Sequence, residues 1–563
     1  MNDTIWHLCE PHPAAAGLAS ALGLPPEIAR ILTNRGIETV EAARTFLYGG
    51  LEDLHDPFLM KGMEAAVARI RRATARGEKI LIFGDYDADG VLSTVMLHKA
   101  LRTLGADVDY YIPDRLEDGY GIKDHHADIL PGRGAKLVIS VDCGIKAVGF
   151  TARAGAGGVD VIITDHHYPG SDLPDAVAVL NPVLSESGYP DKALAGVGVV
   201  FKLIQALLIT EGREASLPHY MKLVSIGTVA DVARLIGENR LFVRHGLKAL
   251  EDVANPGLKR LMDVCGLQNR AVQASDLGFR LGPRINAAGR MGQTDLAVKL
   301  FFAETDGEAR DLVARLEALN TKRQGTEEKI FREAREMVEA RGLDQRYKCL
   351  ILGCETWHKG VIGIVASKIK ETFHRPVILF SYEDGRAVGS GRSISDFALI
   401  DLLDACAPLF QSYGGHKLAV GCTLARENMT ALREAVNALA EEKISGEDLK
   451  RKLRIDAGLD FEAITPEFME HFERLNPFGP GNPKPLFLTR GAEIMSEPRT
   501  MRGRHMKFLA RRNGRFFEAV GWDKADWAAR LARGRTVDLV YSVAVSEYLG
   551  ETKTTLTIED IRP

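Results

Sequence analysis

Short apolar runs alternate with helix-length segments from residue 79 onward. The runs Lys79–Phe83, Val108–Ile112, Lys136–Val141 and Val159–Thr164 are rich in β-branched residues. Between the first two, Val91–Leu101 has helical spacing. This alternation predicts a parallel sheet with helices on both faces, so the expected fold class is α/β.

The predicted secondary structure changes several times along the rest of the chain. Residues 1–55 are helix-prone. Residues 306–341 are charged with apolar positions at helical spacing, which fits either one long connecting helix, with a break near Gly325, or an ordinary pair of surface helices. A second α/β unit begins at Tyr347, and short strands separated by turns after about Arg451 predict a small β barrel. We expect segments 1–55, 56–300, 301–345, 346–446 and 450–563, in keeping with several domains for 563 residues.

The composition limits the cellular compartment and the kinds of site that the protein can have. No run approaches 18 uninterrupted apolar residues, and the first ten residues lack the pattern of a signal peptide, so we expect a cytoplasmic protein without membrane helices. The seven cysteines are scattered without a C-x-x-C pair, which argues against structural zinc and favours free thiols in a reducing compartment. The net charge of −4 argues against a general polyanion-binding surface but not against a local one.

Acidic and histidine side chains follow three of the predicted strands. A further aspartate ends a helical stretch that begins at His219. Because ligands bind outside the carboxyl ends of parallel strands, we expect these side chains to meet at one edge of the sheet. The candidates are Asp85, Asp87, Asp89, Asp142, His166, His167 and Asp231.

So many carboxylates cannot all ionise at close quarters unless cations neutralise them. Mixed carboxylate and imidazole ligands suit Mn²⁺ or Mg²⁺, and two such ions can activate a water and stabilise the leaving oxygen of a phosphodiester. A single D-x-D after a strand is otherwise a loop or helix cap, and an isolated His pair is common at surfaces. Clusters at three strand ends favour metal binding.

The motifs resemble those of a known family. Asp165-His166-His167 is the signature of the DHH phosphoesterases, and segments 84–90, 141–144 and 228–231 resemble the other metal motifs of that superfamily, in order. Segment 281–291 is similar to one typical of the RecJ family, 389–393 and 414–421 resemble the DHH-associated domain, and 476–482 resembles the start of a RecJ OB-fold.

The resemblance implies a 5′-to-3′ exonuclease specific for single-stranded DNA. Such an enzyme uses two Mn²⁺ or Mg²⁺ ions to release 5′-mononucleotides in DNA repair and recombination. It implies a DHH catalytic domain joined by a long helix to a DHH-associated domain, then a C-terminal OB-fold. It also implies a monomer whose partners are a single-strand-binding protein and a RecQ-type helicase. The catalytic residues it implies are Asp87, Asp89, Asp142, His166 and His167.

One position departs from the superfamily pattern. Many members carry a His four residues before the first Asp of the D-x-D pair, but here Phe83 precedes Asp87 at that spacing. One ion therefore lacks that imidazole, and Asp85 is the candidate substitute.

A 5′-phosphate is best held by arginine and by backbone amides in a glycine-rich turn, and Gly389–Arg392 offers both. From the residues alone this stretch also fits an ordinary tight turn. The resemblance assigns the 5′-phosphate pocket to Arg115, Arg290, Ser390 and Arg392. It also favours a substrate role for His416 over a helix cap or a core histidine.

Residues 499–515 hold seven Arg or Lys and no acid, inside the expected barrel. Basic grooves with stacking aromatics are how OB-folds hold single strands, although a charge run is often only a solvated face. The interleaved His505, Phe508, Phe516 and Phe517 either stack on bases or fill the barrel core. The candidate DNA contacts are Arg502, Arg504, Lys507, Arg511 and Arg512.

Two other functions fit the motifs. One is a different DHH phosphoesterase, such as a pyrophosphatase, a small-nucleotide phosphodiesterase or a short-oligonucleotide nuclease, which needs little beyond the two α/β domains. The other is a non-catalytic RecJ-like scaffold that binds DNA without metals. The barrel with its basic run disfavours the first, and the full ligand set disfavours the second.

Overall fold

The computed structural model describes residues 4–114, 119, 121–395, 397–548 and 551–562. The chain forms two compact units. Unit 1 comprises residues 55–233 and 245–451, and unit 2 comprises residues 4–54, 234–244 and 452 onward. Within the described ranges, no helix is long and apolar enough to cross a membrane.

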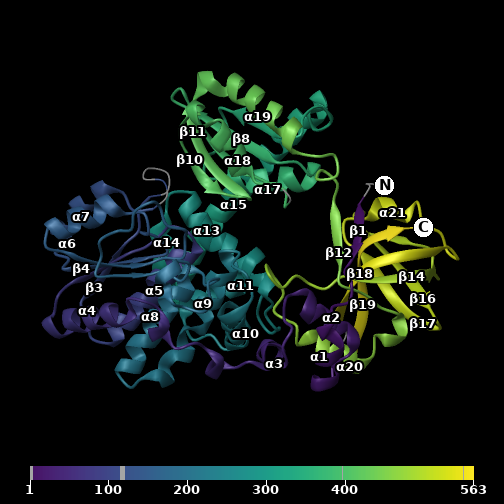
Figure 1. The fold of residues 1–563 in the computed structure, drawn as a ribbon, viewed down its shortest axis with the longest axis horizontal. Helices are drawn as coiled ribbons and strands as arrows, with labels where there is room; N and C mark the ends of the chain where they lie inside the picture. Colours follow the sequence, from purple (N-terminus) through teal and green to yellow (C-terminus); the bar gives the residue numbers. More distant parts are fainter. Residues whose placement is uncertain (1–3, 115–118, 120, 396, 549–550, 563) are drawn as a thin grey trace. The chain divides into compact units, whose positions relative to one another are not determined.

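Unit 1 begins with a five-stranded sheet in the order β3-β2-β4-β5-β6, with every neighbouring pair parallel. Its strands are β2 (Ile80–Phe83), β3 (Val108–Tyr111), β4 (Leu137–Val141), β5 (Asp160–Thr164) and β6 (Ala178–Leu180). All residues of β2 and β4 are buried, as expected when both faces of a sheet are covered. The expected parallel α/β sheet is confirmed (Figure 1).

Helices follow the strands as the sequence predicts. Contacts place α5 and α8 against this sheet and α7 against β5. The helices that matter for the site are α4 (Met63–Arg76), α5 (Ala88–Thr103), α7 (Val148–Ala156), α8 (Gly196–Thr210), α9 (Met221–Ala230), α11 (Pro256–Val264), α13 (Gly282–Arg290) and α14 (Thr294–Phe302).

Residues 306–341 form one continuous helix, α15 (Asp306–Arg341), with no break at Gly325. A glycine inside a helix costs only about 1 kcal/mol relative to alanine. Apolar side chains are buried on both sides of it, including Leu316 and Ile330, so packing outweighs that cost. The single long helix, rather than a pair of surface helices, is therefore correct.

The second sheet of unit 1 has the order β10-β11-β9-β8-β7 and is mostly antiparallel. Its strands are β7 (Leu350–Cys354), β8 (Val377–Glu383), β9 (Arg386–Arg392), β10 (Phe410–His416) and β11 (Ala419–Ala425). The helices α17 (Ile362–Phe373), α18 (Leu399–Ala405) and α19 (Met429–Lys443) complete this part.

The glycine cluster at 389–391 is not the glycine-rich turn that we expected, and the prediction was wrong on this point. Both glycines lie on β9, which pairs with β8 and β11. A Cβ on Gly389 would lie 2.4 Å from the Phe380 ring, and one on Gly391 would lie 2.6 Å from Val420. The glycines are needed for close packing inside the sheet.

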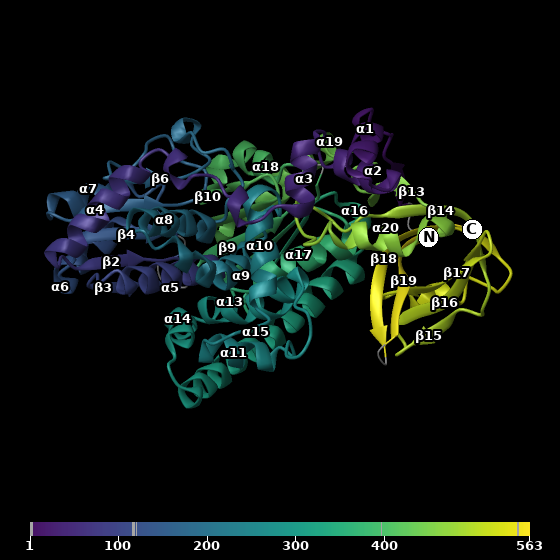
Figure 2. The same cartoon turned by 90° about the horizontal axis from the view of Figure 1, so that it is seen from below.

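Unit 2 is a β barrel that shares its core with the N-terminal segment. Strands β14 (Phe487–Ile494), β16 (His505–Arg512), β17 (Arg515–Gly521), β18 (Thr536–Tyr548) and β19 (Glu551–Arg562) form the barrel, which is closed by pairing of β14 with β16. β18 and β19 run side by side over most of their length (Figure 2). The shorter elements are β12 (Lys452–Ile455), β13 (Ala457–Gly458), α20 (Pro466–Glu473), β15 (Arg499–Met501) and α21 (Ala525–Ala528).

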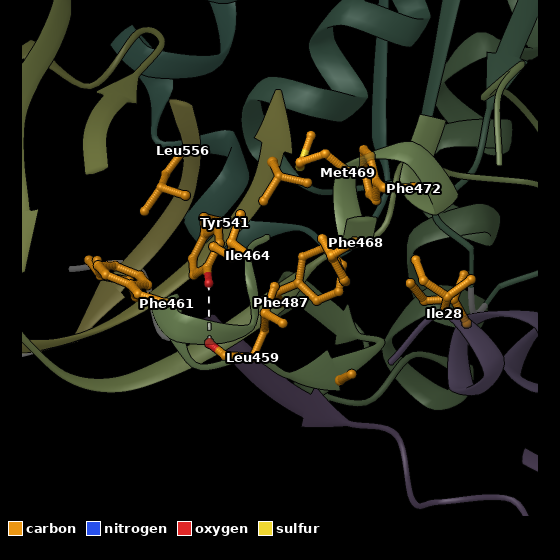
Figure 3. Close-up of a cluster of buried hydrophobic side chains, with 14 of the residues drawn as sticks. Ile28, Leu459, Phe461, Ile464, Phe468, Met469, Phe472, Phe487, Tyr541 and Leu556 are labelled. Carbon is orange, nitrogen blue, oxygen red and sulfur yellow. Dashed lines mark hydrogen bonds between the residues drawn. The ribbon is translucent and has the colours of Figure 1, made fainter. Parts of the chain in front are cut away.

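The N-terminal elements are β1 (Ile5–Leu8), α1 (Ala14–Leu22), α2 (Pro26–Asn34) and α3 (Val40–Tyr48). β1 pairs in parallel with β12. Ile28 of α2 belongs to the same buried cluster as Phe468 and Phe487, and Figure 3 shows this cluster with the hydrogen bond from the Tyr541 hydroxyl to the Leu459 carbonyl. Residues 4–54 and 452–562 therefore fold as one body.

Candidate active site

The carboxyl edge of the parallel sheet gathers the acidic and histidine candidates around His166. Its Nε2 atom lies 3.2 Å from Asp142 Oδ1, 3.9 Å from Asp89 Oδ2 and 3.9 Å from Asp231 Oδ2. These residues come from the ends of β4 and β5, from the start of α5 and from the end of α9. The strand-end argument thus places them correctly.

The loop after β2 is fixed by its own aspartates. Asp87 is the N-cap of α5, and its Oδ1 accepts hydrogen bonds from the N–H groups of Asp89 and Gly90. Asp89 is buried, and its carboxylate accepts the N–H groups of Gly196 and Val197 at the start of α8. Because each carboxylate is anchored through backbone groups, the direction of its remaining lone pairs is set before any ligand arrives.

Asp142 adopts a left-handed backbone conformation with φ of 60°. Such a conformation is uncommon for residues other than glycine and persists where the surroundings enforce it, often at functional sites. Gly196 lies so close that a Cβ there would be 2.5 Å from Asp142 Oδ1. A side chain at position 196 would therefore displace this carboxylate.

The electrostatics of the cluster are unfavourable without a cation. Burial and the neighbouring negative charges raise the pKa of Asp89 to about 8 and that of Asp231 to about 8. The same causes raise the pKa of Asp142 well above its usual range. Burial, with the adjacent His167, lowers the pKa of His166, which keeps its imidazole neutral and able to act as a ligand.

Two supporting side chains were missed by sequence reasoning. Buried Asp165 accepts hydrogen bonds from the N–H groups of Ile145 and His166 and lies 2.8 Å from His167 Nδ1, so it orients the His167 ring. Burial alone would lower the pKa of His167, but the bond to Asp165 and its charge outweigh this and raise it to about 9. Buried Asn181 donates to the His167 carbonyl. The D of the D-H-H triplet could have signalled the first role.

The donor set fits divalent cations. One ligand atom from each member of three groups lies within 4.8 Å of the others: Asp85, Asp87 and Asp142; Asp89, His166 and Asp231; and Asp142, His166 and His167. Asp142 Oδ1 and His166 Nε2 are buried and make no hydrogen bond to any residue that the structure describes. Buried polar atoms of this kind need a partner, and a hard cation accepts both oxygen and imidazole nitrogen.

Phe83 is buried in an aromatic cluster with Tyr111, His126 and Phe150, at ring-centroid distances of 5.2–5.9 Å. It contributes no donor, and Asp85 lies in the group with Asp87 and Asp142. This geometry supports the expected substitution.

The described phosphate-pocket candidates lie on the second sheet of unit 1 and on α13. On β9, Arg392 Nη1 lies 3.3 Å from Ser390 Oγ, and a Cβ on Gly363 would lie 3.2 Å from Arg392 Nη2. Arg290 ends α13 and donates to the Gly360 carbonyl. Arg115 falls outside the described residues.

His416 is neither a helix cap nor a core residue. It ends β10 and is exposed. Partial desolvation, together with the positive charges of Arg392 and His167, lowers its pKa. His416 therefore lies within electrostatic range of both the β9 arginine and the D-H-H triplet.

The barrel cations are less free than their local sequence implies. Arg504 pairs with Asp523, Lys507 with Glu518 and Arg511 with Glu493, while Arg512 donates to the Gly491 carbonyl. Arg502 is exposed. Among the aromatics, Phe508 is buried in the core and Phe517 packs against it, so filling the core is the correct interpretation for these two, whereas Phe516 is exposed.

Family models match three parts of the chain. Residues 79–228 match the DHH family N-terminal domain, 346–442 the DHHA1 domain and 455–560 the RecJ OB domain. The single-stranded-DNA-specific exonuclease RecJ of Bacillus subtilis is 40% identical over 562 residues, which cover 99% of this chain and 70% of that protein. The Escherichia coli protein of the same name is 35% identical, with 96% of each chain covered.

The comparison with solved structures indicates the same family. RecJ from Thermus thermophilus in complex with Mn²⁺ superimposes with a TM-score of 0.84 at 30% identity, covering 100% of this chain and 80% of that one. The Mg²⁺ complex of RecJ from the same organism gives 0.79 at 30% identity, covering 100% and 78%. With the ordered motifs, the three domain matches and relatives of this similarity over nearly the full length, the chain belongs to the RecJ family.

Proposed function

We propose that this chain is a metal-dependent exonuclease that hydrolyses single-stranded DNA from its 5′ end, releases 5′-mononucleotides and acts in DNA repair and recombination. The observation that carries the proposal is the buried cluster of carboxylates and imidazoles at the sheet edge, in which Asp142 Oδ1 and His166 Nε2 have no hydrogen-bond partner in the described chain. The names of the B. subtilis and E. coli relatives support the DNA substrate.

The residues of the cluster have two roles, metal binding and positioning of the ligands. We assign Asp85, Asp87, Asp89, Asp142, His166, His167 and Asp231 to two Mn²⁺ or Mg²⁺ ions, with Asp142 contributing to both. Bound divalent ions supply an activated water and neutralise charge at the leaving oxygen. Asp165 keeps the His167 ring in a fixed orientation, and Asp87 and Asp89 hold the loop that carries them.

Recognition of the 5′ end is assigned to the second sheet of unit 1, to α13 and to Arg115. Ser390, Arg392, Arg290, Arg115 and His416 are the proposed contacts of the 5′-phosphate. Arginine suits this task because its planar donors match phosphate oxygens in pairs. A phosphate held at a fixed place relative to the metals would set the length of the product at one nucleotide.

The proposal extends to the rest of the chain. The DHH catalytic domain is 56–300, the connecting helix 301–345, the DHH-associated domain 346–446 and the OB-fold 450–563, where Arg502, Arg504, Lys507, Arg511 and Arg512 would contact the strand further from its end. Segment 1–55 would belong structurally with the OB-fold. The protein would act as a monomer in the cytoplasm, with a single-strand-binding protein and a RecQ-type helicase as partners.

Digestion of end-labelled strands tests the proposal. We expect Mn²⁺- or Mg²⁺-dependent release of mononucleotides from the 5′ end of single strands, faster with a 5′-phosphate than with a 5′-hydroxyl, and no degradation of blunt duplexes. Pyrophosphate and dinucleotides serve as comparison substrates. Preference for either over long strands would instead assign a different DHH phosphoesterase activity, and DNA binding without cleavage at any metal concentration would leave a scaffold.

A further inference from the structure

The helix α13 lies directly against the loop that carries Asp85, Asp87 and Asp89. A Cβ on Gly289 would lie 2.3 Å from the Tyr86 carbonyl oxygen, so only a glycine allows the helix to come this close. Three residues earlier on the helix, Asn286 Oδ1 accepts the N–H of Ala88 at 2.7 Å. Ala88 lies between Asp87 and Asp89, so this bond holds the backbone of the metal loop itself.

The loop needs this acceptor. Ala88 is the first residue of α5, and the first N–H groups of a helix have no partner within it. The Asp87 carboxylate already accepts the N–H groups of Asp89 and Gly90. The N–H of Ala88 is satisfied from outside the loop, by Asn286.

This bond also fixes which way the amide of Asn286 faces. Only the oxygen of an amide can accept from an N–H, so the NH₂ group must occupy the other position. The NH₂ group makes no hydrogen bond to any residue in the described ranges, and the side chain is only partly buried. Two donor hydrogens are thus held beside the metal loop with their orientation already set.

Arg290 follows Asn286 by four residues on the same helix. Residues at this spacing are neighbours on one helix face, so the two side chains start from adjacent positions. Arg290 reaches the Gly360 carbonyl in the loop before α17. The face of α13 that carries Asn286 and Arg290 therefore spans from the metal loop to the DHH-associated domain.

We infer that Asn286 acts on both the metal loop and the DNA. Its oxygen holds the loop so that Asp87 and Asp89 keep their positions, and its NH₂ group donates to a phosphate oxygen of the strand beside the metals. The inference rests on the proposed function, because it places a DNA phosphate between the metal loop and Arg290. Asn286 is thus a positioning residue for the metals and a direct contact of the substrate.

Two substitutions separate the two roles. Asn286→Asp keeps an acceptor for Ala88 but replaces the donor by a negative charge, whereas Asn286→Leu has similar size and neither group. Mn²⁺ affinity is measured by calorimetry without DNA, and kcat and KM are measured on a 5′-phosphorylated single strand at saturating Mn²⁺. Asn437→Asp and Asn437→Leu are the controls, since Asn437 lies on α19 and its NH₂ group donates to the Arg433 carbonyl of the same helix.

We expect Asn286→Leu to bind Mn²⁺ roughly 10- to 100-fold more weakly, the usual effect of losing a group that orients metal ligands. Asn286→Asp should bind Mn²⁺ at least as tightly as the wild type. Its kcat/KM should nevertheless fall at least about tenfold, because a hydrogen bond to a charged phosphate is lost. The melting temperatures of all variants report folding.

Wild-type Mn²⁺ affinity in Asn286→Leu would overturn the positioning role. Wild-type kcat/KM in Asn286→Asp would overturn the DNA contact, and this variant remains informative if the leucine variant does not fold. A wild-type protein that binds Mn²⁺ but does not cleave single strands would refute the proposed function instead, while the Mn²⁺ measurements would still report on the loop.

Discussion

The salt dependence of DNA binding should distinguish the free cations of the barrel from the paired ones. Arg499, Arg502 and Arg515 are exposed and have no acidic partner among the residues with described side chains. Arg504, Lys507 and Arg511 each pair with an acid outside the run. Replacing the first three by Gln should weaken binding of long single strands more than replacing the second three.

The magnitude follows from counterion release. Each neutralised phosphate contributes about −0.7 to the slope of log K against log salt for single strands, so losing three contacts should flatten the slope by about 2 units. Over a fourfold rise in salt, the wild type would then lose roughly 15-fold more affinity than the variant. For the paired set we expect a smaller change, because each of these cations must leave its carboxylate partner before it can contact a phosphate.

Fluorescence anisotropy of a labelled strand without divalent metal, from about 50 to about 200 mM salt, measures the slope. Cleavage of very short oligonucleotides should be nearly unchanged in both variants, since the sheet-edge cluster and the phosphate pocket are untouched. Equal slopes for the two triple variants would refute the argument from pairing. An unchanged slope in both would remove residues 499–515 from the DNA path.

Four further outcomes are expected. Asp142→Ala should abolish cleavage while leaving the melting temperature and DNA binding largely intact, and near-normal turnover would contradict the two-ion arrangement. Arg392→Ala should lower kcat/KM on 5′-phosphorylated strands by an amount equivalent to about 1.5–3 kcal/mol, and far less on 5′-hydroxyl strands. An equal loss on both strands would show that Arg392 does not contact the 5′-phosphate. Burial and neighbouring negative charges raise the pKa values of Asp89 and Asp231 to about 8 in the metal-free protein, so both carboxylates bind protons below that pH. Mn²⁺ affinity should therefore rise as the pH increases toward 8, and Mn²⁺ binding at pH 7 should release protons. Calorimetry in buffers of different ionisation enthalpy detects this proton release. Arg240, buried in unit 2, donates hydrogen bonds to the carbonyl groups of residues 46 and 474–477. Arg240→Met should therefore lower the free energy of unfolding of unit 2, measured by urea titration, by at least about 3 kcal/mol. A loss below about 1 kcal/mol would show that water replaces these bonds.

Much of the catalytic half of the molecule could be predicted because its signals are local. Buried parallel strands read as continuous apolar runs, and the residue after such a run lies at the carboxyl edge, which is how Asp142 and His166 could be placed. Asp231 could be placed because it directly ends a helix.

The features that were missed depend on contacts distant in sequence. Asn286 lies 198 residues from Ala88, and no pattern in either segment reveals the bond between them. Glycines at 389 and 391 are typical of a turn, and only the neighbouring Phe380 and Val420 explain why a strand needs them. The acids that pair with the basic run, Glu493 and Asp523 among them, lie outside the window that suggested a free polycationic surface.

The shared core of residues 4–54 with the barrel has a consequence for synthesis on the ribosome. β1 and α1–α3 emerge before unit 1, but their partners β12, α20 and β14 emerge after it. At roughly 5–20 residues per second, the intervening chain takes on the order of tens of seconds to make. During that interval Leu18, Ile28 and Leu32, which are buried in the folded protein, lack the part of their core that α20 and the barrel contribute. Because domains generally fold as units during synthesis, we expect unit 1 to fold in the meantime. The apolar N-terminal segment would then wait for its partners, and we expect chaperones to bind it during that interval.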